Sequence, residues 1–137
     1  MRFELATPTR MLITADVDEV VAPGSEGYFG VLPGHAAFLT TLGSGEVCYR
    51  ASGQEKCLAV SGGFAEVTGE RVIILAESAE LPEEIDLPRA ERALKRAEER
   101  LAGRSPLGTP EDIDYARAAA ALARALARLQ AARRAQH

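Results

Sequence analysis

The sequence predicts two structural units, an N-terminal antiparallel β-sandwich and a C-terminal antiparallel two-helix hairpin. Up to residue 77, apolar segments of about four to seven residues alternate with glycine and proline turns, as in sandwiches and barrels. Beyond residue 85, alanine, leucine, arginine and glutamate recur at helical spacing. Strands this short, with no helix between them, exclude a parallel α/β sheet. We therefore expect a sandwich domain over residues 1–84 and a helical domain over residues 85–137.

Apolar and β-branched runs give the positions of the strands. They are expected at residues 2–7, 11–15, 16–22, 28–32, 38–42, 46–51, 55–60, 64–68 and 71–77. Glycine and proline mark turns at residues 7–9, 23–25, 32–34, 43–45, 61–63 and 69–70. The turn at residues 61–63 is thus expected to separate two strands.

Cys48 and Cys57 flank a predicted turn at Ser52 and Gly53. If this turn is a two-residue hairpin loop, the cysteines lie directly opposite each other. They are then either a cross-strand disulfide or redox pair, or two reduced, small apolar residues of a cytosolic sheet. We favour the reduced pair, because a reducing compartment disfavours persistent disulfides. Without a CxxC motif or a Cys/His cluster, the sequence predicts no metal site.

His35 is the one ionisable residue in an individual, glycine- and proline-rich segment at residues 27–39. It could act as a general base, but no serine, cysteine or aspartate at a recognisable spacing would complete a catalytic set. We interpret His35 as structural and residues 25–27 as a solvated turn. The sequence also lacks paired catalytic carboxylates and a phosphate-cradling glycine loop with Lys-Ser/Thr, so an enzyme is not predicted.

Charge is divided unevenly along the 137 residues. Residues 1–80 carry 5 basic and 11 acidic side chains, net −6, whereas residues 81–137 carry 11 basic and 9 acidic, net +2. That excess is too small for nucleic-acid binding, and no run of aromatic residues would stack bases. No secretory signal is visible, and no apolar run approaches the ~20 residues that span a bilayer. The helical part is the better candidate for binding an acidic partner.

The helical domain is predicted as two helices that pack through narrow apolar seams. The seam of the first helix is Leu87, Ala90, Leu94, Ala97 and Leu101. Residues 103–109 break the pattern, and the second helix is expected to begin with Thr109, Pro110 and Asp112. Its seam is expected to be Tyr115, Ala119, Leu122, Leu126 and Leu129. Alanine buries little surface but favours helix, so the hairpin suits opening; the alternative is a permanently closed hairpin.

The joint between the domains combines a helix start with charged residues. Asp86 is placed to cap the first helix, and Pro88 fits within its first turn. Folding the second helix back about residue 106 brings Arg124 and Arg128 towards Asp86 and Arg89. Three arginines beside one carboxylate suit a phosphate chain, because guanidinium groups pair bidentately with phosphate and helix starts favour anions. The alternative is that these arginines only form a solvated helix face.

Four segments of the sequence carry a family resemblance. They are GSEG at residues 24–27, GVLPGHA at 30–36, VSGGFAEV at 60–67 and IDLPRA at 85–90. In this order and spacing the chain resembles, over essentially its full length, the ε subunit of bacterial and chloroplast F-type ATP synthases. That resemblance implies the same two-part fold and a non-catalytic role.

The implied role is that of a rotor and regulatory subunit in the central stalk of a proton-translocating enzyme. The sandwich would bind the γ subunit and the ring of c subunits, at the cytoplasmic side of the membrane. The contact loop that the resemblance implies consists of Ser25, Glu26, Gly27, Tyr28, Phe29, Gly30 and His35. The hairpin would permit turnover when folded on the sandwich, and block ATP hydrolysis when extended towards the β and α subunits.

In several members of this family ATP binds the subunit itself and holds the hairpin down. The positions that match the family's ATP-contacting residues are Glu80, Ile85, Asp86, Arg89, Ala90, Arg96, Arg124 and Arg128. Pro88 inside this motif departs from the family pattern. ATP would be a regulatory ligand and no cofactor is required. The alternative is a ligand-independent coupling scaffold whose hairpin does not sense ATP.

Overall fold

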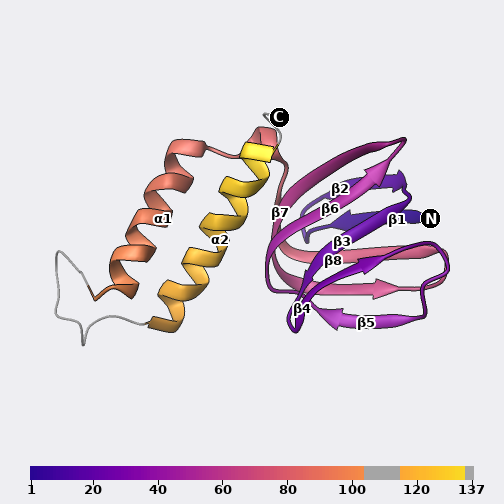
Figure 1. The fold of residues 1–137 in the computed structure, drawn as a ribbon, viewed down its shortest axis with the longest axis horizontal. Coiled ribbons are helices and arrows are strands. Elements are labelled where there is room, and N and C mark those ends of the chain that lie inside the picture. The colour runs from indigo at the N-terminus through magenta and orange to yellow at the C-terminus, as the bar shows by residue number, and fades with distance from the viewer. Residues whose placement is uncertain (104–114, 135–137) are drawn as a thin grey trace.

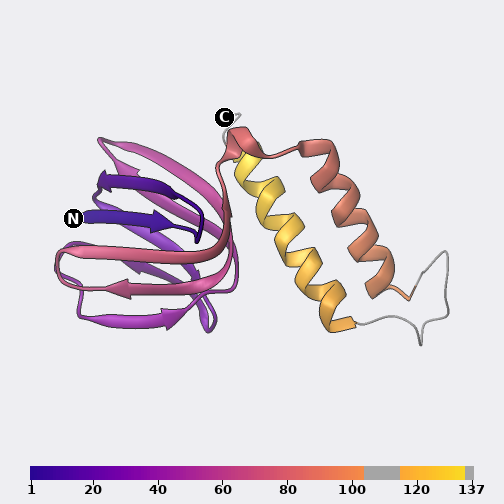
Figure 2. The ribbon, with the colours of Figure 1, turned by 180° about the vertical axis from the view of Figure 1, so that it is seen from behind.

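The computed structural model describes residues 1–103 and 115–134, which form eight strands, a short 3-10 helix and two α-helices. The strands form one body, and the two antiparallel helices lie beside it (Figure 1). α2 (Tyr115–Arg134) lies between the strands and α1 (Leu87–Leu101), and the view from behind shows the same layering (Figure 2). The predicted sandwich followed by a two-helix hairpin is confirmed.

The strands share one hydrogen-bonded network in the order β2-β1-β8-β7-β6-β3-β4, with β5 paired to β7. Their bounds are β1 Arg2–Ala6, β2 Met11–Asp16, β3 Glu19–Gly24, β4 Gly27–Val31, β5 Phe38–Thr41, β6 Ser44–Ala51, β7 Gln54–Val67 and β8 Arg71–Glu80. Apolar side chains on alternate positions point inward and form the core, as the period of two predicts. Its largest fully buried members include Phe3, Leu5, Val20, Leu58 and Ile74.

One pair of strands departs from the antiparallel expectation. β1 and β8 run parallel, with Phe3 opposite Val72 and Leu5 opposite Ile74. They are the first and last strands of the sandwich, so the pair joins the two ends of the domain rather than two strands linked by a short turn. All four of these side chains are buried, which ties the N-terminus to the strand that leads into the helices.

The predicted turn at residues 61–63 is wrong. β7 runs through it, and keeps its register with β8 from Ser61 opposite Ser78 to Gly63 opposite Ala76. Gly62 and Gly63 adopt positive φ angles of 70° and 109°, which glycine tolerates within a strand. On its other edge, β7 pairs with β6 up to Ser61 and with β5 from Phe64 onwards. The glycines therefore lie where β7 changes partners, and not where a strand ends.

The hairpin between β6 and β7 has the two-residue loop that was predicted. Ser52 and Gly53 have φ angles of 52° and 76°, and Ala51 pairs with Gln54. This register places Cys48 directly opposite Cys57, and the two form a disulfide, so the expected reduced pair is wrong for this structure. The expectation rested on the compartment, whereas the loop fixes the local geometry. A Glu46 oxygen and both sulfurs lie within 4.8 Å of one another, but the sulfurs are bonded to each other.

The first helix follows its prediction and the second does not. Asp86 caps α1, Pro88 lies in its first turn, and Ala90 and Ala97 of the predicted seam are buried. In α2 the expected seam is confirmed at Leu129, which is buried, but is wrong at Tyr115, Ala119 and Leu126, which are exposed. The buried residues of α2 are Ala118, Ala125, Ala127, Leu129, Ala131 and Ala132. These residues lie on two faces of α2, because one side of the helix packs on α1 and another side packs on the sandwich.

The predicted start of the second helix, at Thr109, Pro110 and Asp112, lies outside the described residues. In the part of the chain that is described, neither helix is long and apolar enough to cross a membrane.

Candidate functional site

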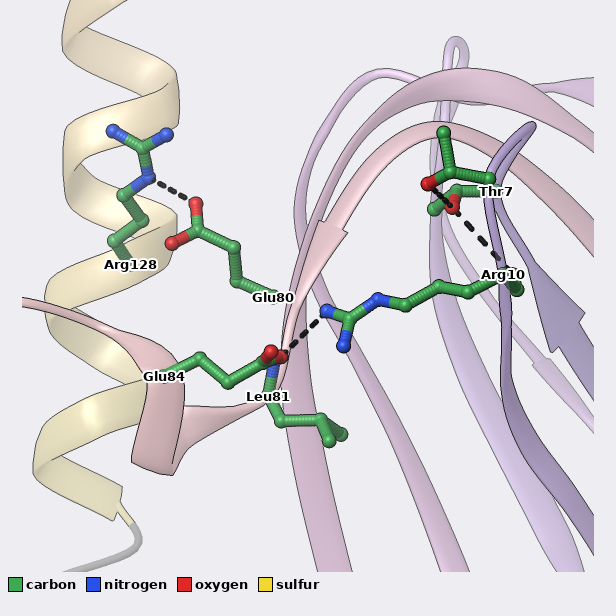
Figure 3. Close-up of polar contacts among 7 residues, drawn as sticks. Thr7, Arg10, Glu80, Leu81, Glu84 and Arg128 are labelled. Carbon is green, nitrogen blue, oxygen red and sulfur yellow. Dashed lines mark hydrogen bonds and ion pairs between the residues drawn. The ribbon is translucent and has the colours of Figure 1, made fainter.

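The chain leaves the sandwich through a short, anchored hinge. After β8, residues Pro82–Glu84 form the 3-10 helix η1, and Glu84 reaches back to its start. The Glu84 carboxylate accepts hydrogen bonds from the Leu81 backbone N–H at 2.9 Å and from Arg10 Nη2 at 2.7 Å (Figure 3). The bond from Arg10 is the main reason why the pKa of Glu84 lies below its ordinary value. The hinge is thereby fixed to the β1–β2 connection.

Asp86 begins α1 as its N-cap. Its carboxylate accepts a hydrogen bond from the Arg89 backbone N–H at 3.1 Å. A cap of this kind satisfies one of the helix's otherwise unpaired donors. The predicted capping role of Asp86 is confirmed, and the same carboxylate borders a pocket.

A pocket of about 180 Å³ lies where the hinge, β8 and α2 meet. Its lining is Glu80, Glu84, Ile85, Asp86, Arg89, Ala90 and Arg128. Six of the eight residues predicted as ATP contacts are thus brought together from segments up to 48 positions apart. The volume is below the roughly 300–1,000 Å³ of ordinary small-molecule sites, so it accommodates part of a nucleotide rather than all of it.

The other two predicted ATP contacts lie outside this pocket. Arg124 borders an adjacent hollow that it shares with Arg128, Ser61 and Ser78. Arg96 is exposed in the middle of α1 and is not among the described residues that line either hollow. Arg124 and Arg128 are one turn apart on the same face of α2, so Arg124 lies one turn further from the hinge, beside β7 and β8.

The charges in the pocket differ from the expected three arginines around one carboxylate. Three carboxylates line it, those of Glu80, Glu84 and Asp86, with the two arginines Arg89 and Arg128. Arg128 already donates a hydrogen bond from Nε to Glu80 Oε1 at 2.6 Å, as Figure 3 shows. An incoming phosphate group would therefore have to replace or share Glu80 as the partner of Arg128.

A second ion pair, which sequence reasoning missed, holds the C-terminal end of α2. Arg134, in the last turn of α2, donates from Nε and Nη2 to the two carboxylate oxygens of Glu46, at 3.1 and 3.3 Å. Glu46 is only 6% exposed and is the one buried charged residue among those described. The bond to Glu46 is the main cause that raises the pKa of Arg134. No local sequence signal marked this site, because Glu46 lies on the face of β6 that points away from the sandwich core, whereas its neighbour Val47 points into the core.

Between these ion pairs the hairpin docks through small side chains. Ala127 and Ala131 of α2 pack with Ala59 of β7, and Ile85 of the hinge joins them. Alanines let the helix approach the sheet closely but bury little apolar area each. Docking therefore depends on the ion pairs that Arg128 and Arg134 of α2 form with the sandwich.

The predicted contact loop lies at the turn between β3 and β4. Ser25, Glu26, Gly27 and Tyr28 are exposed, and the Tyr28 hydroxyl accepts a hydrogen bond from the Glu46 backbone N–H at 3.0 Å. Phe29 and His35 both lie against Phe38, at ring-centre distances of 5.2 and 6.3 Å. The remaining predicted member, Gly30, is exposed in β4. The loop is thus connected to the strand that carries the docking carboxylate.

Three large apolar side chains form an exposed strip on neighbouring strands. Leu39 of β5 is 73% exposed, and Phe64 of β7 and Leu75 of β8 are more than half exposed. Phe64 of β7 is opposite Leu75 of β8, and Leu39 of β5 points to the same face of the sheet as these two residues. We call these three residues the outer apolar strip. Contiguous apolar exposure of this kind is typical of protein-binding surfaces.

Two family models match consecutive parts of the chain. The β-sandwich domain of the ATP synthase delta/epsilon chain matches residues 1–82, and the long alpha-helix domain of the same chain matches residues 83–133. The ATP synthase epsilon chain of Carboxydothermus hydrogenoformans is 50% identical over 106 residues, which cover 77% of this chain and 79% of that protein. The epsilon chain of Koribacter versatilis is 48% identical over 104 residues, covering 76% and 73%.

Solved structures show the same fold. A chain of the Euglena gracilis mitochondrial ATP synthase, in a structure with OSCP, F1 and c-ring, matches with a TM-score of 0.75 at 26% identity, covering 98% of this chain and 80% of that one. A chain from the central stalk and c-ring of the Tetrahymena thermophila enzyme matches with a TM-score of 0.54 at 15% identity, covering 99% and 96%, and this likeness concerns the fold alone. Since two family models and bacterial relatives of about half identity agree, the chain belongs to the ATP synthase delta/epsilon chain family, with the epsilon chains of bacterial F-type enzymes.

Proposed function

We propose that this chain acts as a non-catalytic rotor subunit whose helical hairpin binds ATP when folded on the sandwich and inhibits ATP hydrolysis when it extends. The observation that carries the proposal is the composition of the hinge pocket. Glu80 belongs to the sandwich, Asp86 and Arg89 to the start of α1, and Arg128 to α2. A ligand in this pocket contacts residues that meet only in the folded state, so its binding free energy would favour that state.

The ion pair between Glu80 and Arg128 lowers the expected affinity for ATP, because ATP would compete with Glu80 for Arg128. Arg128 is a good phosphate ligand, because its guanidinium can pair bidentately with phosphate oxygens. In the structure that group is engaged by Glu80 at 2.6 Å. Binding of ATP must therefore offset the loss or sharing of this contact, which predicts a modest affinity.

The rotor role rests on the sandwich surface. The outer apolar strip and the turn between β3 and β4 are separate exposed features, and together they offer two contact regions. We assign the γ subunit to the apolar strip and the c-subunit ring to the turn that contains Tyr28. This assembly would keep the chain at the periphery of the membrane, on the cytoplasmic side.

The inhibitory role rests on the charge of the helices. Residues 81–137 carry a net charge of +2, against −6 for residues 1–80. A basic hairpin that leaves an acidic sandwich suits an acidic surface, and we assign this surface to the β and α subunits of the catalytic head.

The test is a calorimetric titration of the intact chain with magnesium-free ATP. We expect saturable binding at millimolar ATP or below in the unmodified chain, and strong weakening in Arg128→Ala. Arg124→Ala should weaken binding less, because Arg124 borders the adjacent hollow. Arg133→Ala is the matched control: Arg133 is an exposed arginine of α2 that does not line the pocket, so this variant should bind ATP like the unmodified chain.

The competing function is a ligand-independent scaffold. The ion pairs that already dock the hairpin favour it, because they need no ligand; they join Arg10 to Glu84, Arg128 to Glu80, and Arg134 to both Glu46 and Glu55. Absence of binding up to ~10 mM ATP would support the scaffold, since the linkage free energy RT ln(1 + [L]/Kd) would then stay small. Equal weakening by Arg128→Ala and Arg133→Ala would show that only the overall positive charge of α2 matters, and not a contact of Arg128 with the ligand.

A further inference from the structure

The Cys48–Cys57 disulfide is part of the surface on which α2 docks. Glu46 and Cys48 are two positions apart on β6 and therefore point to the same side of the sheet. Opposite them on β7 are Ala59 and Cys57. Ala59 packs on α2, and Glu46 binds Arg134, so both neighbours of the disulfide on this face contact the helix.

Both cysteines border hollows open to solvent. Cys57 lines a pocket of about 550 Å³ together with Ala131 and Arg134 of α2. Cys48 lines a separate hollow of about 50 Å³. Small thiol reagents can therefore approach the disulfide, although Cys57 itself is buried.

We propose that Cys48 and Cys57 form a redox-responsive site that controls the docking of the C-terminal end of α2. On reduction, the S–S bond takes up two electrons and two protons from a dithiol, which is itself oxidised to a disulfide. The natural donor class is a dithiol protein of the thioredoxin type, and the reverse reaction restores the bond. Cytosolic disulfides are usually transient and redox-sensing, which fits this role.

Packing links the redox state to docking. The disulfide holds together the two strands that present Glu46 and Ala59 to α2. Reduction removes this cross-link, so at this point the two strands are held together by their backbone pairing alone. The strands would open locally more often, and the Glu46–Arg134 contact would weaken. Oxidation is therefore expected to hold the hairpin on the sandwich, and reduction to loosen it.

The test compares hydrogen–deuterium exchange of the intact chain with and without dithiothreitol, after mass spectrometry has established the state of the disulfide. Amides of residues 127–134 should exchange about threefold faster, or more, after reduction. Amides of β1 and β2, which pair with neither β6 nor β7, serve as the internal reference. The effect does not require ATP and is measured in its absence, so its outcome is separate from that of the calorimetric test.

Two variants make the test specific. Cys48→Ser with Cys57→Ser should exchange like the reduced protein and should not respond to dithiothreitol. Arg134→Ala, in which the end of α2 is already released, should respond much less than the unmodified chain. The proposal is overturned if the disulfide does not form under oxidant, if exchange is equal in both verified redox states, or if the response persists in the double serine variant.

Discussion

Arg134 and Glu46 form a two-pronged ion pair between residues 88 positions apart, with Nε–Oε2 and Nη2–Oε1 distances of 3.1 and 3.3 Å. The carboxylate lies under the last turn of α2, and the backbone N–H of the same residue donates to the Tyr28 hydroxyl. Glu46 is thus contacted both by Arg134 of α2 and by Tyr28 of β4. If the hairpin leaves, Glu46 loses its nearest cation.

Arg134→Ala should release the end of α2. Removing one partner of a buried pair typically costs 3–5 kcal/mol, but the Arg134 side chain is 53% exposed, so about 1–2 kcal/mol is expected here. The cost should appear in local opening of residues 127–134, measured by hydrogen exchange, and not in the unfolding of the sandwich. Arg133→Ala, at the exposed neighbouring position, is the control and should have little effect.

A second substitution separates two effects of Arg134→Ala: the loss of the ion pair, and the cost of leaving the buried Glu46 carboxylate without a partner. Adding Glu46→Gln to Arg134→Ala removes the unpaired carboxylate, so the double variant should be less destabilised than Arg134→Ala with native Glu46. Exchange in Arg134→Ala equal to that in the unmodified chain would show that the ion pair does not support docking.

Glu84→Gln should reduce thermal stability at neutral pH but not at low pH. Arg10, and then the Leu81 N–H, keep the pKa of Glu84 below its ordinary value of 4.5. A lowered pKa stabilises the folded state above the unfolded pKa, and this stabilisation is lost as the pH falls through the lower, folded value. Because the pair is partly exposed, we expect a loss of only about 2–4 °C in Tm at pH 7.

The pH experiment compares melting curves of the two proteins at pH 7 and pH 3. Other carboxylates with lowered pKa, such as Glu4, are present in both proteins and cancel in the difference. Glu83→Gln, at the adjacent exposed position, should show no such convergence. A Tm difference that does not shrink as the pH falls from 7 to 3 would contradict the electrostatic origin.

The sequence was sufficient for the fold class because local signals agreed with each other. Asp86 followed by Pro88 marked the start of α1, and Ser52-Gly53 fixed the hairpin that pairs Cys48 with Cys57. The same kind of signal failed at Gly62-Gly63, because positive φ serves a bend within a long strand as well as a turn. These glycines form a bend and not a turn because β7 changes its pairing partner there, from β6 to β5, and local sequence does not show this tertiary feature.

The phase of α2 could not be predicted, for a physical reason. A helix that contains so many alanines has little amphipathic contrast, and burying alanine yields too little free energy to define one face. The structure instead uses α2 on two sides, which leaves Leu126 exposed while Ala127 and Ala131 are buried. The ion pair of Arg134 with Glu46 was missed for a related reason, since no local pattern connects residues so far apart.

Asp86→Ala and Asp86→Asn should separate helix capping from ligand binding. Alanine removes the bond to the Arg89 N–H and should cost about 1 kcal/mol in the stability of α1, whereas asparagine caps nearly as well as aspartate. If the negative charge contacts ATP, Asp86→Asn should weaken ATP binding in calorimetry while its melting curve stays unchanged. Unchanged ATP binding in Asp86→Asn would restrict this residue to its capping role.

Gly63→Ala should destabilise the sandwich severely. A Cβ atom at this position would lie 2.8 Å from the Ala76 Cα, and the φ angle of 109° is unfavourable for alanine. We expect a loss of more than about 3 kcal/mol in the free energy of unfolding by urea. Gly69→Ala, where a Cβ would meet no atom within 4 Å, is the control. Similar stability of the two variants would mean that β7 does not need this bend.

Leu39→Asp should weaken binding of the proposed γ partner without unfolding the protein. Leu39 is 73% exposed, so its replacement should change the free energy of unfolding by no more than about 0.5 kcal/mol. At the centre of an interface, however, a charge in place of leucine should lower affinity roughly tenfold or more. Met11→Asp is the matched control, because Met11 is also apolar and exposed but lies on β2, which pairs with none of the three strands that carry the strip. If purified γ subunit binds both variants equally well, the outer apolar strip is not its contact surface, and the turn that contains Tyr28 would be the next surface to test.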